Sequence, residues 1–566
     1  MASEKLLHPA IQEHLARVGI IDDHAVTQFI SPSMQELPSP WSLKDIDKAV
    51  NLIISKMELN QPILVWGDYD VDGISATALI VLYFRTIGYA NIFYHIPNRL
   101  TEGYGINPEY IEILYQKLGS DVLLVSVDCG ISNYDEIIHA KQLGWQVVVT
   151  DHHLMPDYEV PADAVVNPQQ KDCQFPYKTV SGATVAFYLV AAIRSKIKET
   201  NSLSNTYISE VNLKQFLSFV SLGTVADVMP LNRVNRILVK AGFEAIADNK
   251  IHGINRLLTE LDIDHSNIQS EKIAFSVAPT INAAGRLGKP EVALNALIQE
   301  KDADDPSVYK KLVSLNKKRK QVSNNDYDRA RQQAESLPDG QRAIVIKGDF
   351  HDGILGITAS RLAEEYLVPA IVFTIDKKNP HLLKGSGRAP EHFDLYCTLK
   401  RCAHYLTRFG GHRAAAGMSL ENINFEVFRT FFSEQSIIEF EKEPVTTGNA
   451  IEPIYLPLEE AHNPLLLKNI LQLEPTGEGN PKPIFYDSDV SFVSLKRFGQ
   501  NFNHLRGVIR GRYKNLPFIG FNLKGLNRIV SDEPVYRFFY TPMFDQYNGS
   551  NTWKIRAMDI WQYHQT

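Results

Sequence analysis

Short apolar runs alternate with amphipathic segments through the first half of the chain, and this alternation predicts its fold. Strand-like runs lie at residues 63–66, 91–96, 122–127, 146–149 and 164–166. Apolar residues at helical spacing predict helices over residues 74–88, 108–118 and 134–143. Mostly apolar strands that alternate with helices are typical of a parallel sheet covered on both faces. We therefore expect a doubly wound, parallel-sheet α/β domain over residues 61–300.

The patterns on either side of this domain predict four further parts. They are a helical N-terminal preface at 1–60, a long connecting helix at 301–340, a second α/β domain at 341–435 and a β-barrel at 450–566. In the preface, Ser42 is a candidate N-cap for the helix that holds Ile46 and Met57. The acidic, irregular stretch from Ser433 to Pro453 is interpreted as a linker.

Composition and charge limit the classes of protein to which the chain can belong. Its 566 residues, with 44% hydrophobic and 22% charged side chains, are typical of a soluble protein of several domains. No apolar run approaches the roughly 18 residues of a membrane helix, and acidic residues among the first 30 argue against a signal peptide. Four cysteines without a CxxC pair favour a reducing compartment. With a net charge of −7, any nucleic-acid surface requires local basic patches.

Three aspartates follow the first strand, at Asp68, Asp70 and Asp72, before Gly73. Carboxylates this close repel one another unless a cation compensates them. An EF-hand loop also begins Asp-x-Asp-x-Asp-Gly, but it needs a bidentate Glu at its twelfth position, where this chain has Leu79. A calcium loop is thereby excluded. A solvated acidic turn stays open as the alternative to a metal site.

Metal-type ligands also follow two other strands of the predicted sheet. Asp128 comes after the run 122–127, and His152 and His153 come after 146–149. Taken singly, these residues could be a turn and surface histidines. The carboxyl ends of parallel strands meet at one edge of the sheet, however, where such folds bind ligands. Carboxylates with imidazole and no thiolate suit Mn²⁺ or Mg²⁺, and four carboxylates exceed what one cation needs, so we expect two divalent cations.

These motifs resemble those of the DHH phosphoesterases. The likeness rests on Asp68–Gly73, Val127–Gly130, Asp151–His153 and, as a fourth motif, Leu222–Pro230. The resemblance implies that Asp227 is a further metal ligand, although the apolar segment 217–228 reads as a plain helix. It implies that Asp70, Asp72, Asp128, His152 and Asp227 hold two metals, with Asp68 as an additional ligand. His153 would contact the phosphate.

Further motifs resemble the RecJ family of single-strand-specific exonucleases, over nearly the whole chain. They are Pro97–Arg99, Glu102–Gly105, Ile281–Arg286, Leu355–Arg361, Lys384–Arg388, Phe409–Gly417 and, opening an OB-type barrel, Leu473–Pro481. The substrate-binding residues so implied are Arg99, Tyr104, Arg286, Ser360, Arg361, Ser386, Arg388, Gly410, Gly411 and His412. Of these, Arg286, Ser386 and Arg388 are predicted to grip a terminal 5′-phosphate. One departure is Pro279-Thr280, where the family often has Pro-Arg.

Two basic segments bear on nucleic-acid binding. Residues 317–320 in the connecting helix are Lys-Lys-Arg-Lys, which fits a solvated helix as well as a DNA contact. From Val490 to Ser531 the chain has no Asp or Glu, and its basic residues are interleaved with aromatic ones such as Phe502 and Tyr513. Phosphate-binding cations with stacking aromatics are typical of a single-strand groove. The alternative is that the aromatic residues form the barrel core.

The combined interpretation is a metal-dependent exonuclease that degrades single-stranded DNA in the 5′ to 3′ direction. The polarity, the DNA preference and a role in DNA repair, recombination and mismatch repair come from the resemblance. So do single-strand-binding protein and a DNA helicase as partners, a monomeric state and a cytoplasmic location. Two alternatives are a DHH phosphodiesterase acting on nanoRNA or cyclic dinucleotides, and a non-catalytic DNA-binding scaffold. The acid-free C-terminal run argues against the first, and the complete set of metal ligands argues against the second.

Overall fold

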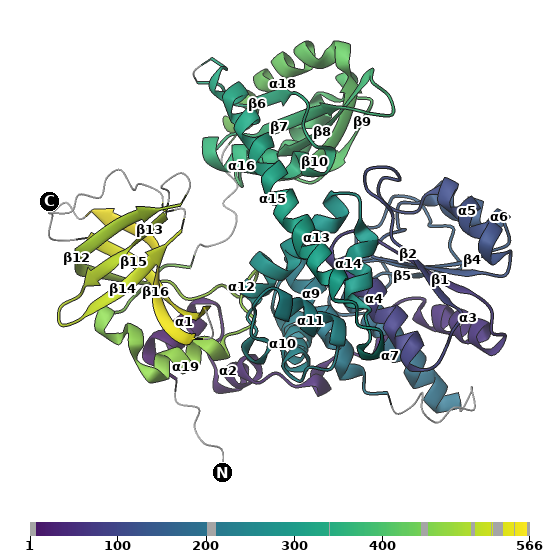
Figure 1. Cartoon of the computed structure of the whole chain (residues 1–566), viewed down its shortest axis with the longest axis horizontal. Helices are drawn as coiled ribbons and strands as arrows, with labels where there is room; N and C mark the ends of the chain where they lie inside the picture. Colours follow the sequence, from purple (N-terminus) through teal and green to yellow (C-terminus); the bar gives the residue numbers. More distant parts are fainter. Residues whose placement is uncertain are drawn as a thin grey trace.

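The chain forms two α/β lobes joined by a long helix, with a β-barrel beside the first lobe (Figure 1). This computed structural model describes residues 7–200, 211–338, 340–442, 451–499, 504–521, 523, 536–547 and 550–562. The joining helix is α15 (Pro306–Glu335), which begins at the N-cap Asp305, whose side chain accepts a hydrogen bond from the Ser307 amide. A long connecting helix is therefore present, as the sequence pattern predicted.

The first lobe is built on a five-stranded parallel sheet in the order β2-β1-β3-β4-β5. Its strands are β1 (Ile63–Gly67), β2 (Ile92–His95), β3 (Leu123–Val127), β4 (Gln146–Thr150) and β5 (Ala164–Val166). Helices α3 (Ile46–Glu58), α4 (Val71–Thr86) and α7 (Gly182–Thr200) cover one face, and α5 (Pro108–Leu118) and α6 (Tyr134–Gln142) cover the other. The doubly wound prediction is confirmed. The strand order reverses between β1 and β3, which marks the ligand-binding crevice of such sheets.

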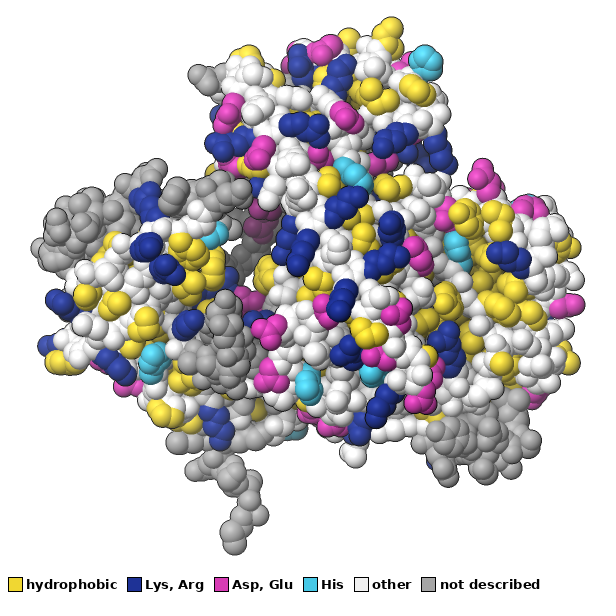
Figure 2. Space-filling model, viewed as in Figure 1, with side chains coloured by type: hydrophobic (Ala, Val, Ile, Leu, Met, Phe, Trp, Pro, Cys, Tyr) yellow, Lys and Arg dark blue, Asp and Glu magenta, His cyan; other side chains and the backbone are white. Residues whose placement is uncertain are grey.

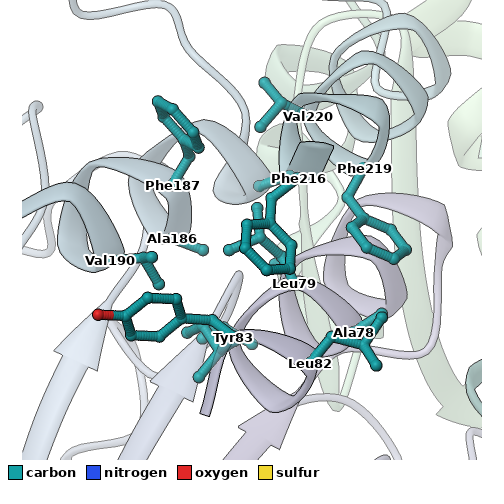
Figure 3. Close-up of a cluster of buried hydrophobic side chains, with 14 of the residues drawn as sticks. Ala78, Leu79, Leu82, Tyr83, Ala186, Phe187, Val190, Phe216, Phe219 and Val220 are labelled. Carbon is teal, nitrogen blue, oxygen red and sulfur yellow. The ribbon is translucent and has the colours of Figure 1, made fainter. Parts of the chain in front are cut away.

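A helical layer extends the first lobe beyond its sheet. It comprises η3 (Leu213–Phe216), α9 (Leu217–Ala226), α10 (Arg233–Ala247), α11 (His252–Glu260), the π-helical η5 (Ile273–Val277), α13 (Ala278–Arg286) and α14 (Pro290–Leu297). Figure 3 shows how α4 packs in this layer: Leu79 and Tyr83 meet Phe187 and Val190 of α7 and Phe216 of η3. Tyr83 and Phe216 are in edge contact, with ring centroids 6.2 Å apart. This buried core fixes α4, α7 and α9 relative to one another.

The second lobe contains a mixed five-stranded sheet in the order β6-β7-β8-β10-β9, in which β6 and β7 alone are parallel. The strands are β6 (Ile344–Lys347), β7 (Ala370–Ile375), β8 (Leu382–Arg388), β9 (Arg408–Gly411) and β10 (Ala415–Glu421). Helices α16 (Leu355–Tyr366), α17 (Leu395–Arg401) and α18 (Phe425–Phe440) complete it. The predicted linker was wrong at its start, because residues 433–440 finish α18, where Ser436 and Glu439 are buried.

The C-terminal barrel closes through a pairing between β12 and β15. Its strands are β12 (Phe485–Phe498), β13 (His504–Arg510), β14 (Asn515–Gly520), β15 (Tyr536–Tyr547) and β16 (Ser550–Gln562), with the short β11 (Ile454–Tyr455) beside β12. The parallel pair β14–β16 sits among antiparallel ones. A five-stranded barrel of this kind agrees with the predicted OB-type fold. Helix α19 (Pro464–Gln472) packs below it in Figure 1.

The N-terminal preface divides between two cores, which the sequence pattern did not reveal. Helices α1 (Pro9–Arg17) and α2 (Asp23–Ile30) contribute Ile11, Leu15 and Ile30 to the core of the barrel, whereas α3 packs on the first sheet. The Ser42 prediction was also wrong. Asp45, in a left-handed conformation and without a side-chain capping bond, precedes α3, while Ser42 ends a 3₁₀ turn. Among the described residues, no helix has the length and apolar character needed to cross a membrane.

Candidate metal centre and anion pocket

The edge of the first sheet gathers carboxylates and imidazoles from three strand ends and one helix end. Asp68 and Asp70 follow β1, Asp128 follows β3 and His152 follows β4, while Asp227 is the residue at which α9 ends. Nε2 of His152 lies 3.0 Å from a carboxylate oxygen of Asp128 and 3.6 Å from one of Asp227. Oxygens of Asp68, Asp70 and Asp128 lie within 4.8 Å of one another. The structure thus brings all the predicted metal ligands together at the switch point of the sheet.

Asp72 is held by the start of another helix. Its carboxylate accepts hydrogen bonds from the backbone amides of Gly182, at 2.5 Å, and Ala183, at 2.9 Å, at the N-terminus of α7. The positive end of a helix dipole and free amides favour a carboxylate at this place. Close packing requires glycine here, because a β-carbon at Gly182 would lie 2.7 Å from the Asp128 side chain, and one at Gly223 would overlap Asp72. These helix positions were not predicted from the sequence.

The electrostatics of the cluster fit a bound cation. Burial, together with the charge of Asp70, raises the pKa of Asp72 to about 7, and burial, with the charge of Asp72, raises that of Asp227 to about 8. The pKa values of Asp68 and Asp128 are also well above normal, chiefly through burial. Buried oxygens of Asp68, Asp128 and Asp227 have no hydrogen-bond partner. Buried carboxylates that repel one another and lack donors are the ligands a divalent cation requires.

The two histidines differ in protonation. Burial lowers the pKa of His152 to about 4, so its imidazole is neutral and has a lone pair for a metal. For His153, burial opposes the charge, but a 2.7 Å contact from Nδ1 to the Asp151 carboxylate outweighs it and raises the pKa to about 9. Asp151 also accepts hydrogen bonds from the amides of Ile131, His152 and His153. Asp151 belongs to a motif recognised in the sequence, but its role in positioning His153 was not predicted.

An anion pocket of guanidinium groups lies beside the carboxylates. The charges of Arg99, Arg319 and Arg388 act on Arg286, whose pKa falls to about 10, mainly through burial, while Asp70 acts in the opposite sense. Arg99 also stacks over Tyr69, with its Cζ 5.3 Å from the ring centroid, and Tyr104 is in edge contact with His153. Of the predicted substrate-binding residues, Arg99, Tyr104, Arg286 and Arg388 therefore border the metal centre. Arg319 was not among the predicted site residues.

Glycines bring the second lobe against this pocket. A β-carbon on Gly353 would overlap the carbonyl oxygen of Arg286, and one on Gly356 would lie 2.8 Å from Nη2 of Arg388. Arg388 donates a hydrogen bond to Ser386 Oγ at 3.1 Å, so Ser386 belongs to the pocket. Gly410, on β9, is in register with Gly417 of β10, which pairs with Ser386. Because a β-carbon at Gly410 or Gly417 would meet no atom within 4 Å, the surface beside Ser386 is open.

Other predicted residues lie away from the cluster. Arg361 stacks on Tyr327 of α15, with its Cζ 3.6 Å from the ring centroid, and bonds Asn324. Ser360 donates to Glu364 one turn along α16. Gly411 and His412 are exposed at the end of β9, and their backbone pairs with the start of β10. No described contact joins these four residues to the arginines of the pocket.

The barrel presents aromatic and basic side chains on its surface, as well as a core. Phe518 is buried at 4% exposure, whereas Tyr513 is 80% exposed with Arg512 beside its ring. Phe498, His504 and Phe521 form a second group, in which Arg506 stands over Phe498. Figure 2 shows Lys and Arg side chains on this barrel and across the middle of the same face. Phe502, Lys524 and Arg528 lie outside the described residues.

The parallel sheet with carboxylates at its switch point defines a metal-dependent phosphoesterase of the DHH type. Residues 62–223 match the model of the DHH family, N-terminal domain, residues 340–436 the DHHA1 domain, and residues 454–559 the RecJ OB domain. The single-stranded-DNA-specific exonuclease RecJ of Salmonella typhimurium is 33% identical, over 92% of this chain and 91% of its own length. The chain belongs to the RecJ family. The Escherichia coli member is 32% identical, over 92% of this chain and 91% of its own.

Solved structures of RecJ proteins also resemble this chain. The crystal structure of RecJ from Thermus thermophilus in complex with Mn²⁺ is 26% identical, with a TM-score of 0.75 over 99% of this chain and 79% of that one. An exonuclease RecJ bound to manganese is 28% identical, with a TM-score of 0.60 over 74% of this chain and 99% of that one. The Mn²⁺ in these relatives agrees with the carboxylate and imidazole ligand set described above.

Proposed function

We propose that this protein hydrolyses single-stranded DNA from the 5′ end, one phosphodiester bond at a time, with two divalent cations, Mn²⁺ or Mg²⁺. One observation carries the proposal: the guanidiniums of Arg286 and Arg388 lie near the carboxylate cluster, where the second lobe packs closely on the first, so that an anion pocket adjoins a metal centre. A pocket that accepts a terminal phosphate next to a cleavage centre would restrict cleavage to the strand end. The family to which the chain belongs supports single-stranded DNA as the substrate.

The proposed roles follow from the geometry of the cluster. Asp70, Asp72, Asp128, His152 and Asp227 would hold the cations, with Asp68 as an additional ligand; Asp128 would be shared, because it belongs to two of the possible ligand groups. Such cations, when bound, supply an activated water and polarise the phosphoryl oxygens. His153 keeps its proton through Asp151 and is 45% exposed, so its imidazolium can donate a hydrogen bond to a phosphate oxygen.

The barrel is proposed to hold the strand beyond the cleavage site. Exposed Tyr513 and the group of Phe498, His504 and Phe521 offer faces for stacking bases, and Arg506 and Arg512 offer charge for phosphates. A cytoplasmic location, a monomeric state, roles in DNA repair and recombination, and contacts with single-strand-binding protein and a DNA helicase complete the proposal. They rest on the family and not on a described contact.

The decisive experiment is digestion of end-labelled oligonucleotides in Mn²⁺ or Mg²⁺. Single-stranded DNA labelled at the 5′ end should release a labelled mononucleotide first, whereas the 3′ label should stay on long products until late. Duplex DNA, single-stranded RNA and a cyclic dinucleotide serve as comparison substrates. Release of the 3′ label first, or faster hydrolysis of the cyclic dinucleotide, would contradict the proposal.

Deletion of the barrel tests whether the barrel binds the strand while the two lobes carry out hydrolysis. A chain cut near Ser433 would interrupt α18 and leave α1 and α2 without their barrel core, so the deletion variant should retain residues 34–442. This variant keeps every proposed metal ligand. We expect weaker binding of long single strands with a flatter salt dependence, and a much smaller change in hydrolysis of a trinucleotide. Identical salt slopes for the full chain and the deletion variant would contradict the role given to the barrel.

A further inference from the structure

Helix α15 carries four consecutive basic residues, but only one of them turns inward. Lys317, Lys318 and Lys320 are exposed, whereas Arg319 is half-buried, and burial lowers its pKa. Helix α15 packs against α13, the helix that ends at Arg286, and the charge of Arg319 acts on Arg286. The solvated-helix interpretation therefore fits the three lysines, and Arg319 needs a separate explanation.

A buried relay of polar side chains sets the direction of Arg319. Its Nη2 donates to Asn316 Oδ1 at 2.6 Å, and Asn316 Nδ2 donates to Thr280 Oγ1 at 2.9 Å. The Thr280 hydroxyl donates in turn to the Ser276 carbonyl at 2.7 Å. Arginine can only donate, so the amide oxygen of Asn316 must face it and the amide nitrogen must face Thr280. Thr280 is fully buried and Asn316 is 9% exposed, which makes the relay rigid.

The guanidiniums of the pocket form no close ion pair. Among the residues that the structure describes, no acid lies in ion-pair contact with Arg99, Arg286, Arg319 or Arg388, and the other three charges all lower the pKa of Arg286, although the charge of Asp70 acts in the opposite sense. Arg286, Arg319 and Arg388 are partly buried and Arg99 is exposed beside them. Cations that repel one another in such a place are costly without an anion. A terminal phosphate monoester has a second pKa of about 6 and carries close to two negative charges at pH 7, whereas an internal diester carries about one.

We propose that Arg319 is a specificity residue, which completes the pocket of Arg99, Arg286 and Arg388 and selects a doubly charged terminal phosphate over an internal phosphodiester. Thr280 and Asn316 are positioning residues that act through Arg319. This inference rests on the proposed 5′-directed function. It also accounts for Thr280, which stands where an arginine was expected: the threonine is too deeply buried to touch a phosphate, and the guanidinium arrives from α15 instead.

The test compares hydrolysis of one oligonucleotide that carries either a 5′-phosphate or a 5′-hydroxyl. The ratio of the two kcat/KM values is measured for the wild-type full-length protein, Arg319→Ala, Arg319→Lys and the control Arg331→Ala. Arg331 lies on the same helix, about 18 Å further along, where it pairs with Glu335 and Glu365. Loss of a bond to a charged group predicts a drop of about 10- to 100-fold in the ratio for Arg319→Ala. The ratio for Arg319→Lys should lie between those of the wild type and Arg319→Ala, and the ratio for Arg331→Ala should match that of the wild type.

The relay is tested by Thr280→Val and Thr280→Ser. Valine keeps the shape but removes the acceptor for Asn316, so the phosphate preference should fall by several-fold, mainly through KM for the 5′-phosphorylated substrate. Serine keeps the hydroxyl and should restore the preference. A second readout, inhibition by thymidine 5′-monophosphate relative to thymidine, should weaken in parallel with the loss of preference, because it reports binding of a phosphate monoester that is not itself cleaved.

The outcomes distinguish a failure of the role proposed for Arg319 from a failure of the proposed 5′-directed exonuclease activity. If the wild type does not degrade single-stranded DNA from the 5′ end, the proposed function fails. If it does, but Arg319→Ala slows both substrates equally and leaves inhibition by the monophosphate unchanged, Arg319 is not a specificity residue and the proposed function stands. Equal losses of the 5′-phosphate preference in Thr280→Val and Thr280→Ser would contradict the role given to the Thr280 hydroxyl in positioning Arg319.

Discussion

Asp128 offers a test of the metal centre in which activity and stability should move in opposite directions. It is 2% exposed, its φ is 60°, and it belongs to two of the possible ligand groups, one with Asp68 and Asp70 and one with His152. Asp128→Asn keeps the shape of the side chain and removes its charge. We expect the variant to lose Mn²⁺ binding and nuclease activity, yet to be more stable than the wild type when no metal is present.

The magnitude follows from the separation of the carboxylates. Oxygens of Asp68, Asp70 and Asp128 lie within 4.8 Å of one another. At an effective dielectric of about 20, two charges at that distance repel by about 3 kcal/mol. Asp128 faces two such neighbours, but partial protonation relieves part of the repulsion. A gain of about 3 kcal/mol in the metal-free stability of the first lobe is therefore expected.

The same charges fix a pH dependence for the metal-free wild type. The pKa of Asp72 is raised to about 7 and that of Asp227 to about 8, so folding favours their protonated forms. A carboxyl group whose pKa is raised on folding costs no stability at a pH below its unfolded pKa, which is near 4. Above that pH the loss of stability increases as the pH rises toward the folded pKa. Metal-free stability should thus fall between about pH 4 and pH 8, and saturating Mn²⁺ should remove this slope.

The assay is thermal unfolding in EDTA and in Mn²⁺ at several pH values, with calorimetric Mn²⁺ titration and digestion of single-stranded DNA. Asp157→Asn is the control, because Asp157 is exposed and its substitution changes the formal charge equally. Asp128→Asn should unfold at a higher temperature than the wild type in EDTA and gain little from Mn²⁺. Mn²⁺ binding equal to that of the wild type, or a lower unfolding temperature in EDTA, would refute the electrostatic argument.

Three further predictions concern the anion pocket, the surface of the barrel and the attachment of the barrel to the first lobe. Gly356→Ala should push the Arg388 guanidinium aside, because the new β-carbon would lie 2.8 Å from Nη2, and so reduce the preference for 5′-phosphorylated over 5′-hydroxyl DNA by about tenfold without unfolding the lobe. Tyr513→Ala should weaken single-strand binding by about 1–3 kcal/mol at an unchanged melting temperature, whereas Phe518→Ala should lower the melting temperature. The Arg236 guanidinium donates hydrogen bonds to the carbonyls of Phe29, Leu473 and Pro475. Arg236→Leu should therefore weaken the attachment of the barrel by about 1–3 kcal/mol. Hydrogen exchange near Leu473 should become faster, while trinucleotide hydrolysis is retained.

The proximity of the candidate metal ligands could be predicted from the sequence because these residues follow a rule of topology. Strand ends of a parallel sheet meet at one edge, so Asp70, Asp128 and His152 could be grouped before any contact was known. Asp227 needed the family resemblance, since it ends a helix and follows no strand. The strand and helix periodicities gave most element boundaries within a few residues, because apolar strands and capped helices are local features.

What the sequence could not provide are pairings between distant segments. The amides of Gly182 and Ala183 hold Asp72 from 110 and 111 residues away, and Asn316 bonds Thr280 across 36 residues. Packing of α1 on the barrel side of the molecule joins residues 461 apart, as in the bond from the His8 amide to Asn469. Nothing in the local pattern of either partner signals such contacts, because the helix N-terminus of α7 and the amphipathic face of α1 would look the same with any other partner.

End-directed cleavage requires a fixed distance between the group that recognises the end and the group that cuts. In the proposed function the two would come from different lobes, because Arg388 and Ser386 belong to the second and the carboxylates belong to the first. Two features fix their separation. Gly353 touches the Arg286 backbone so closely that no β-carbon would fit, and α15 spans both lobes without an internal break. Because Arg286 and Arg319 reach the pocket from the first lobe and from α15, the bound phosphate itself would add a third connection between the lobes. A terminal phosphate would then bind best when the lobes hold the spacing needed for cleavage, which ties recognition of the end to hydrolysis of the bond beside it.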